Sequence, residues 1–522
     1  MKLLEQVRNI KLECLLLLLC LVVGFGLRFY AFDQKSLWID EVHTYNDSRE
    51  GLSGQIKYFK EHPADLLHPP LFYVLTHIFH PFEKPERELR ILPLIFGILS
   101  VPMIYFLARL FSPSIAIPCT LALTFMAYHI SFSQDGRPYS LVMFLGMVGL
   151  YFFTKYLKTQ RKRDLLFVAL SFALLFYTSY SSIPFILLSQ VLWFYRPGET
   201  EKRPRVSSLL ILNGTTLLLC APWILFLILN YKGQPVTNTH FIEAFGSLWN
   251  IFRGTFNDWV PFTPLTVVTL LLLILFLFLS PSRKNALLLV GTVVLPIAGL
   301  FLFSKILHIQ HFFSSKYVIA FLPLFLISVF LSLTNLETKF PKGNKVLRFK
   351  PLFLILLIAS NLIILPLYYR SERQDFRGLI SYLNGQLHDG DKIFVRSVAY
   401  IPGMLHYFGV HPESRHHRFP VWLENSGTEI VARVTLGSKD KRFGIHYSSA
   451  GYSRYLADGG RLWVVLGKEA GEEERQKGSL LQFKGVFDGS FSHFRRFPED
   501  ASMYLFLSDP DSSNRKATRL TR

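Results

Sequence analysis

Charged residues are scarce in this chain, at 18% of its 522 residues, whereas 50% of the residues are hydrophobic. Soluble domains carry about 25% charged residues, so the composition excludes an ordinary soluble protein and indicates a membrane protein. The formal net charge is +19. The basic residues lie largely between apolar runs, where they face the cytoplasm and anionic lipid, so this charge does not indicate a nucleic-acid partner.

Cysteine is scarce as well, with four residues that all lie inside apolar runs. Such cysteines are typical of small buried hydrophobes, so we expect neither disulfides nor a cysteine metal site. The chain also lacks a glycine-rich phosphate loop after a strand, which argues against a soluble nucleotide-binding domain. It shows no internal repeat of the kind found in inverted-repeat transporters.

The N-terminal apolar run follows Lys2, Arg8 and Lys11, as in a secretory signal peptide. It has no small-x-small cleavage site, Arg28 follows, and further apolar runs come later. We therefore expect a first span that is retained.

About eleven apolar runs approach the length of roughly 20 residues that a helix needs to cross a bilayer. They lie at roughly 12–32, 89–109, 113–131, 138–156, 164–180, 182–196, 207–230, 263–281, 286–304, 317–334 and 351–369. A further apolar segment, 71–82, has only a dozen residues, among them His77 and His80.

The positive-inside rule decides how segment 71–82 is interpreted. If this segment does not cross, all the connections rich in Lys and Arg face the cytoplasm together with the N-terminus: 155–164, 196–205, 281–285 and 335–350. We therefore expect an interfacial helix on the outer face. The parts that then face outward, on the periplasmic side of an inner membrane, are 33–88, 133–139, 231–262 and the tail from about 370.

The tail is polar and contains no further apolar run of that length. Helical spacing marks 375–387, and strand patterns mark 392–396, 461–466 and 503–507. The predicted fold class is therefore mainly α: a polytopic helical membrane domain of about 11 spans, 1–369, followed by a small outward α/β domain, 370–508. The polar end, 509–522, is predicted to be disordered.

Four predicted outward elements carry polar residues that the fold alone does not require. They are Trp38-Ile39-Asp40-Glu41-Val42-His43, His68-Pro69-Pro70-Leu71, Gln134-Asp135-Gly136-Arg137-Pro138-Tyr139, and the stretch from Lys305 through His308 and His311 to Ser314-Ser315-Lys316-Tyr317. Carboxylates at a membrane boundary are costly unless something uses them. A carboxylate can deprotonate an acceptor hydroxyl, while Arg and Lys neutralise a phosphate that leaves.

Each element also has a simpler interpretation. Arg137 and Lys316 sit at span boundaries, where long cationic side chains often snorkel to the interface. His68 precedes two prolines and could serve only as a helix cap. His308 and His311, or His43 beside the two carboxylates, could hold a divalent metal, although the sequence does not require one.

The ordered set of motifs resembles a known family. "SLWIDEVHT", "HPPLFYVL", "ERELRILPLIFGILSVPMIYFLARLF" and "ISFSQDGRPYSL" follow one another as in bacterial glycosyltransferases of the GT-C superfamily. Specifically, the chain resembles the protein-mannosyltransferase-like enzymes of glycosyltransferase family 39 and its relatives. "SSKYVIAFLPLFLI" and "QDFRGLISYLNGQLHDGDKIFV" are similar to later parts of that family.

This resemblance implies transfer of a sugar from a polyprenyl-phosphate donor to an acceptor hydroxyl on the outer face, usually with inversion. The acceptor stays open among protein, lipopolysaccharide and other glycolipids. The implied roles are catalytic for Asp40 (the general base), Glu41 and Asp135, donor-phosphate binding for Arg137, Lys316 and Tyr317, and substrate binding for Trp38, His43, His68 and Tyr139. Family members often have Arg at the position of Lys316 and Glu at that of Asp135.

Two other classes compete with a membrane glycosyltransferase. A transporter or lipid flippase would place charges near the bilayer midplane in broken helices, whereas here the charges collect at one face. A scaffold with a partner-binding tail would leave the four polar elements without a purpose. The sequence therefore favours the enzyme.

Overall fold

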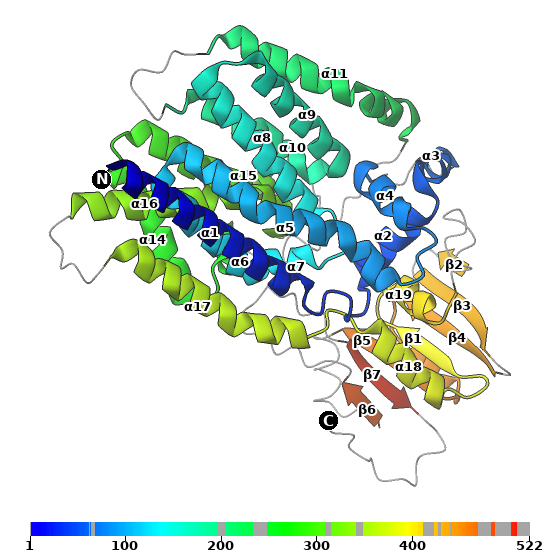
Figure 1. The fold of residues 1–522 in the computed structure, drawn as a ribbon. Coiled ribbons are helices and arrows are strands. Elements are labelled where there is room, and N and C mark those ends of the chain that lie inside the picture. The colour runs from blue at the N-terminus through cyan, green and yellow to red at the C-terminus, as the bar shows by residue number, and fades with distance from the viewer. Residues whose placement is uncertain are drawn as a thin grey trace. The chain divides into compact units, whose positions relative to one another are not determined.

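A computed structural model of the chain is shown in Figure 1. It describes residues 2–61, 63, 68–196, 204–232, 248–307, 315–340, 348–410, 422–425, 430–438, 441–467, 482–485 and 503–508. The chain divides into two compact units, which we call the membrane unit (1–32, 59–78 and 88–368) and the C-terminal unit (33–58, 79–87 and 369–522). Residues 33–58 and 79–87, expected to belong with 1–369, thus group with the tail.

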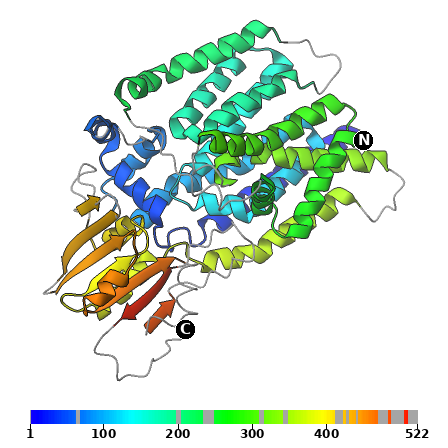
Figure 2. The same ribbon diagram turned by 180° about the vertical axis from the view of Figure 1, so that it is seen from behind.

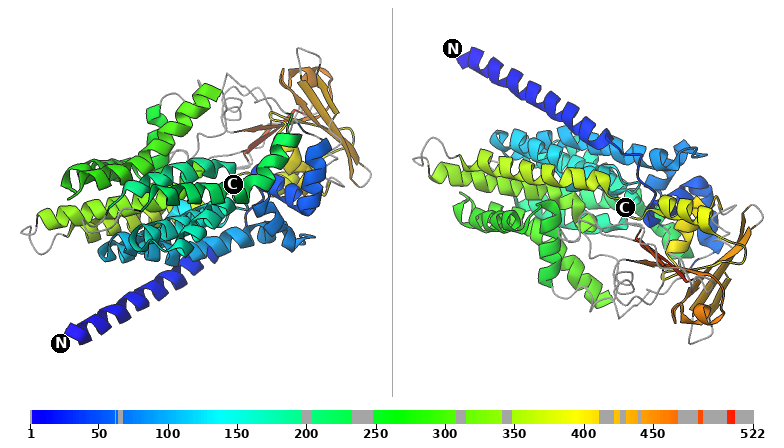
Figure 3. Two further views of the ribbon diagram at one scale, coloured as in Figure 1. Left: turned by 90° about the horizontal axis from the view of Figure 1, so that it is seen from above. Right: turned by 90° about the horizontal axis from the view of Figure 1, so that it is seen from below.

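The membrane unit is built from helices, most of them strongly apolar (Figure 1). Their bounds are α1 (Lys2–Phe29), α4 (Leu71–Thr76), η1 (His77–Phe79), α5 (Pro85–Phe111), α6 (Pro113–Phe125), α7 (Ala127–Ser133), α8 (Tyr139–Thr159), α9 (Lys162–Thr178), η2 (Tyr180–Ser182), α10 (Ile183–Leu188), η3 (Ser189–Phe194), α11 (Val206–Asn230), α13 (Leu248–Trp259), α14 (Thr263–Leu279), α15 (Arg283–Leu307), η4 (Ser315–Phe321), α16 (Leu322–Lys339) and α17 (Phe349–Arg370). Helix α1 is one uninterrupted rod (Figure 3). The ends of η1 and α5 extend into the C-terminal unit.

All eleven predicted runs fall on helical segments of the described chain. Among the described residues, six helices are long and apolar enough to cross a membrane, or up to eight if each of two bent pairs counts as one span, which is fewer than the predicted number of about eleven. Their outward-facing side chains are rich in exposed Leu, Ile, Val and Phe, which in a soluble protein would be unfavourable over so many turns. The predicted class, a mainly helical polytopic membrane protein with a small C-terminal sheet, is confirmed.

The short segment after the proline pair does not form a spanning helix. It folds as α4, which has six residues, followed by the three-residue η1. A helix rises 1.5 Å per residue, so these nine residues are far too short for a hydrocarbon core about 30 Å thick. This agrees with the expectation that 71–82 does not cross.

The predicted run 113–131 is not one straight helix, because α6 and α7 meet at a bend of 61°. A break leaves backbone groups without helical partners. The fully buried Arg28 of α1 donates to the carbonyl of Leu123 at 2.9 Å and to that of Thr124 at 3.2 Å. On the other side, Asn361 Oδ1 accepts from the Ala127 N–H at 2.8 Å. Side chains from other helices thus provide hydrogen-bond partners for the backbone groups at the bend.

The C-terminal unit contains a seven-stranded sheet with the order β2-β3-β4-β1-β5-β7-β6 (Figures 1 and 2). The strand β1 lies parallel to β4 and β5, and the other pairs are antiparallel. The strands are β1 (Lys392–Val395), β2 (Trp422–Asn425), β3 (Ile430–Ser438), β4 (Lys441–Ser448), β5 (Leu462–Gly467), β6 (Gln482–Gly485) and β7 (Met503–Ser508). The helices are α2 (Ile39–Arg49), α18 (Phe376–Gln386), α19 (Tyr400–Tyr407) and α20 (Ser453–Ala457), with α3 (Gly51–Glu61) shared between the units.

The two faces of this sheet bury separate apolar clusters. Ile393 and Val395 of β1 pack with α18 and α19 on one face, whereas Phe394 packs with Tyr452 and Tyr455 on the other. This is the alternation that a strand imposes. The predicted helix 375–387 and the strands at 392–396, 461–466 and 503–507 are therefore confirmed as α18, β1, β5 and β7. The predicted disordered end, 509–522, lies outside the described residues.

His446 in β4 makes the sheet sensitive to acid. Burial, reinforced by the positive charges of Arg433, Lys392 and Arg454 and opposed by Asp458, lowers the pKa of His446 from 6.5 to about 4. The ring therefore stays neutral in the folded unit and becomes protonated at higher pH in the unfolded one. Neutral His446 therefore contributes on the order of 2 kcal/mol to the free energy of unfolding above pH 6.5. This contribution is lost as the pH falls toward 4.

We expect hydrogen exchange of the 441–448 peptide in the full chain, corrected for intrinsic rates, to lose protection between pH 6.5 and pH 4.5. The variant His446→Gln should show a flatter dependence over the same range, because glutamine does not titrate. An equal loss of protection in both proteins would contradict this assignment.

Candidate active site

The Asp40-Glu41 pair stands in the first turn of α2. Trp38 precedes the helix with an extended backbone, and the fully buried Glu41 accepts from the Trp38 N–H through Oε2 at 3.3 Å. This hydrogen bond gives a partner to a backbone donor at the helix start, and carboxylates suit the positive end of the helix dipole. Asp40 is half-buried, so it is the more accessible of the two carboxylates.

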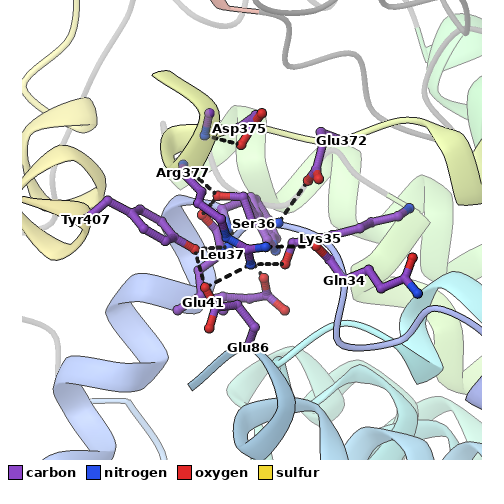
Figure 4. Close-up of polar contacts among 12 residues, drawn as sticks. Gln34, Lys35, Ser36, Leu37, Glu41, Glu86, Glu372, Asp375, Arg377 and Tyr407 are labelled. Carbon is purple, nitrogen blue, oxygen red and sulfur yellow. Dashed lines mark hydrogen bonds and ion pairs between the residues drawn. The ribbon is translucent and has the colours of Figure 1, made fainter. Parts of the chain in front are cut away.

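Side chains from later in the chain fix the segment that leads into α2 (Figure 4). They accept hydrogen bonds from three of its backbone N–H groups: Ser36 N–H to Glu372 Oε2 at 2.9 Å, Leu37 N–H to Tyr407 Oη at 2.7 Å, and Ile39 N–H to Gln374 Oε1 at 2.9 Å. The irregular segment that leads into α2 is therefore held in place by side chains from later in the chain.

A second layer of contacts surrounds Arg377, which lies in the first turn of α18 (Figure 4). Its guanidinium donates to the carbonyls of Gln34 at 3.1 Å and Lys35 at 3.3 Å, and it pairs with Glu86 Oε1 at 2.9 Å. The Tyr407 hydroxyl donates to the same Glu86 oxygen at 2.9 Å. Burial, and then the Glu86 carboxylate, raise the pKa of Tyr407 above its ordinary value, so this hydroxyl remains a donor.

The two predicted substrate-binding residues near Asp40 differ in exposure. Trp38 is 8% exposed, and the guanidinium carbon of Arg373 lies 4.5 Å from the centre of its ring. This is a cation–π contact that fixes the indole. His43 is exposed on α2 and accessible to a ligand.

Sequence reasoning missed the residues that hold segment 34–39. They are Glu86, Glu372, Arg373, Gln374, Arg377 and Tyr407. The available signal is the dense polar run 371–377 directly after the last apolar span, which is unusual for a simple connection. Nothing local in that run identifies its partners, which lie 291 to 343 positions away in the chain.

In the membrane unit, the predicted Asp135-Arg137 loop joins α7 to α8. The turn is closed by the Arg137 N–H, which donates to the Asp135 carbonyl at 2.6 Å. The buried Gln134 ties it to the end of α1, because its Nε2 donates to the carbonyls of Arg28 at 2.8 Å and Tyr30 at 2.7 Å. Asp135 is 3% exposed, so its carboxylate is largely shielded from solvent.

Arg137 lies beside the predicted proline-pair element. Its Nη1 is 3.5 Å from the Tyr73 hydroxyl, and the Tyr73 ring stacks on His68 with centroids 5.5 Å apart. The structure therefore brings together two predicted site residues, Arg137 and His68, through a tyrosine that was not predicted.

Lys316, Tyr317 and Tyr139 form the other predicted group that the structure brings together. The Lys316 ammonium lies 5.8 Å from the centre of the Tyr139 ring and 5.5 Å from that of Tyr317. Next to it, the Ser315 hydroxyl donates to Asp258 Oδ2 at 2.6 Å, and both residues are 3% exposed. Asp258 of α13 is a buried carboxylate that the sequence analysis did not single out.

The described residues hold no group of three or more His, Cys, Asp or Glu side chains placed to bind a metal ion. The predicted alternative of a metal at His308 and His311 falls outside the described residues. His43 is described, and no such group forms around it there.

These features define a class of protein: a multi-pass helical membrane protein in which cationic and aromatic side chains gather at the starts of helices, and whose C-terminal α/β unit contains a helix-start carboxylate. Residues 67–230 match the model of the family described as dolichyl-phosphate-mannose-protein mannosyltransferase. This match confirms, over that region, the resemblance to membrane glycosyltransferases that the motifs indicate.

Two solved structures are also similar to this chain. ArnT from Cupriavidus metallidurans in the apo state is 10% identical with a TM-score of 0.49, over 97% of this chain and 99% of that one. The same protein bound to undecaprenyl phosphate is 11% identical with a TM-score of 0.49, over 98% and 99%. None of the curated proteins matches the chain.

Proposed function

We propose that this protein is an integral membrane glycosyltransferase that moves a sugar from a polyprenyl-phosphate donor to an acceptor hydroxyl. The observation that carries the proposal is that two cationic residues, Arg137 and Lys316, lie near Tyr139 at the start of α8. Arg137 stands two residues before Tyr139, and the Lys316 ammonium lies 5.8 Å from the Tyr139 ring. Two cations balance one phosphate, and Arg can bind it with a two-pronged contact.

The family match supports the same donor class. Residues 67–230 contain His68, Asp135, Arg137 and Tyr139, and the family's description names a sugar linked to dolichyl phosphate. A lipid carrier also solves a delivery problem, because its chain partitions into the bilayer and carries the sugar to a site beside the membrane.

In the proposed reaction, Asp40 takes the proton from the acceptor hydroxyl as the acceptor oxygen attacks the anomeric carbon of the donor sugar. The bond between that carbon and the phosphate oxygen breaks, and polyprenyl phosphate leaves with both electrons of the bond. Attack from the face opposite the leaving group inverts the anomeric configuration. Arg137 and Lys316 stabilise the charge on the departing phosphate, and Tyr317 packs beside Lys316.

The remaining predicted residues take supporting roles. Glu41 would assist by holding the first turn of α2, and Asp135 would shape the acceptor site. Trp38, His43, His68 and Tyr139 would contact sugar or acceptor. We place the reaction on the periplasmic face of the inner membrane, with the N-terminus in the cytoplasm, because the connections rich in Lys and Arg then all lie on the cytoplasmic side.

The experiment that tests this function compares two donors. Purified protein in detergent receives either labelled polyprenyl-phosphate sugar or labelled nucleotide sugar, together with a delipidated acceptor extract. We expect label to reach the acceptor only from the lipid-linked donor, because the chain has no glycine-rich phosphate loop after a strand for a nucleotide. Transfer from the nucleotide sugar without a lipid carrier would refute the proposal, and label that stays on the lipid would favour a flippase.

A further inference from the structure

Within the C-terminal unit, side chains from the tail after residue 369 bond to the segment that leads into the Asp40 helix. Gln374, Arg377 and Tyr407 bond to residues 34–39, and Glu86 bonds in turn to Arg377 and Tyr407. Figure 4 shows Glu86, Arg377 and Tyr407 around this segment. We call these four residues the clamp. All four, as well as Asp40, belong to the same compact unit.

The Tyr407 hydroxyl is the central atom of the clamp. It accepts from the Leu37 N–H at 2.7 Å and donates to Glu86 Oε1 at 2.9 Å. The same Glu86 oxygen receives the Arg377 guanidinium, whose other donors reach the carbonyls of Gln34 and Lys35. The hydroxyl therefore connects the backbone leading to Asp40 with a buried charge pair, and charge-assisted hydrogen bonds of this kind are stronger than neutral ones.

The helix also has contacts outside the clamp. Glu41 caps its first turn, and further along Tyr45 packs edge-to-face on His406 of α19 with centroids 4.8 Å apart. The clamp acts on the residues that lead into the helix and on its first residue, where the Ile39 N–H, next to Asp40, donates to Gln374 Oε1. The clamp therefore fixes the position and direction of the start of α2, which carries the Asp40 carboxylate.

We propose that Glu86, Gln374, Arg377 and Tyr407 are positioning residues for Asp40, so that the C-terminal unit is part of the catalytic machinery. This inference rests on the proposed function, in which Asp40 is the base. A displacement of about 1 Å at a reacting group can cost roughly 100-fold in rate. Loosening the clamp should therefore lower the rate of the chemical step without weakening donor binding.

Two tyrosines of the same helix provide a matched test. Tyr407→Phe removes the hydroxyl at the centre of the clamp. Tyr400→Phe removes a hydroxyl on the same helix that lies instead beside Gly467 of β5. In the full-length protein, we expect Tyr407→Phe to lower kcat roughly 10- to 100-fold with the KM for donor within about twofold of wild type. Tyr400→Phe should behave as wild type.

Tyr407→Phe combined with Asp40→Asn distinguishes a role in positioning Asp40 from a general loss of folding or activity. If Tyr407 acts through the Asp40 carboxylate, Tyr407→Phe should cause no further loss once that carboxylate has been removed. Hydrogen exchange of a peptide covering residues 34–42 should also be faster in Tyr407→Phe and unchanged in Tyr400→Phe.

An equal loss of rate in both backgrounds would overturn the inference, and so would wild-type kcat and exchange in Tyr407→Phe. These failures differ from a failure of the proposed function. If Asp40→Asn alone keeps normal turnover, the base has been assigned wrongly. If Asp40→Asn is inactive and Tyr407→Phe is fully active, only the positioning role is wrong.

Discussion

Replacing Asp40 by asparagine should lower transfer about 100- to 10,000-fold, the range that general base catalysis typically contributes. Asparagine keeps the size and planarity of the side chain but cannot accept the acceptor's proton. The helix should survive the change, because Glu41 rather than Asp40 provides the cap at Trp38. The measurement is the initial rate of sugar transfer by purified protein at saturating donor and acceptor.

Glu41→Gln is the matched control for this substitution. The amide oxygen of glutamine can still accept from the Trp38 N–H, so we expect a much smaller loss of rate than in Asp40→Asn. Unchanged hydrogen exchange across residues 34–49 in Asp40→Asn would show that α2 remains folded. Near-normal turnover in Asp40→Asn would mean that the base lies elsewhere, and the buried Asp135 would be the next carboxylate to test.

Neutralising either cation near Tyr139 should raise the KM for the lipid donor. Each charge-assisted hydrogen bond to phosphate is worth about 1.5–3 kcal/mol, which corresponds to roughly 10- to 100-fold. We therefore expect Arg137→Gln and Lys316→Gln each to raise the donor KM by about that factor, while the KM for acceptor changes little. Lys316→Arg keeps the charge and should retain most of the donor affinity, whereas Arg137→Lys loses the two-pronged geometry and should not.

Arg109→Gln is the control for the loss of one positive charge at the end of a span. Arg109 pairs with Glu13 at 2.6 Å, and its side chain is 46% exposed. Exposed pairs contribute little, so we expect an unchanged donor KM. An equal rise in donor KM for Arg109→Gln and Lys316→Gln would show that the effect is a general one of charge. A rise in acceptor KM alone at Arg137 or Lys316 would assign those residues to the acceptor.

The sequence predicted those parts of the structure that depend on local pattern. Long apolar runs marked the helices, and short continuous apolar runs within 392–396 and 503–507 marked β1 and β7. The bend between α6 and α7 could not be read in this way, because Arg28 and Asn361, distant in the chain, satisfy its backbone groups. The pairing of β1 with β4 and β5 likewise joins segments that are separated by long stretches of chain.

In the candidate site, too, local sequence patterns could be predicted and contacts between distant residues could not. The "SLWIDEVHT" motif was sufficient to single out Asp40 and Glu41, and the structure has both in the first turn of α2. The contact of Arg137 with Tyr73 joins residues 64 positions apart. The partners of segment 34–39 are more than 300 positions away in most cases. Side chains that act by holding another segment leave no periodic signal, and only the folded chain identifies them.

The central claim is that the bond between the sugar and the donor phosphate breaks. It is tested most directly with a polyprenyl-phosphate sugar that carries one label in the sugar and a second label in the phosphate. Our account predicts that the sugar label moves to the acceptor, with inverted anomeric configuration, while the phosphate label stays on the lipid. Transfer of both labels to the acceptor would show that a phosphorus–oxygen bond had broken, and it would contradict the account.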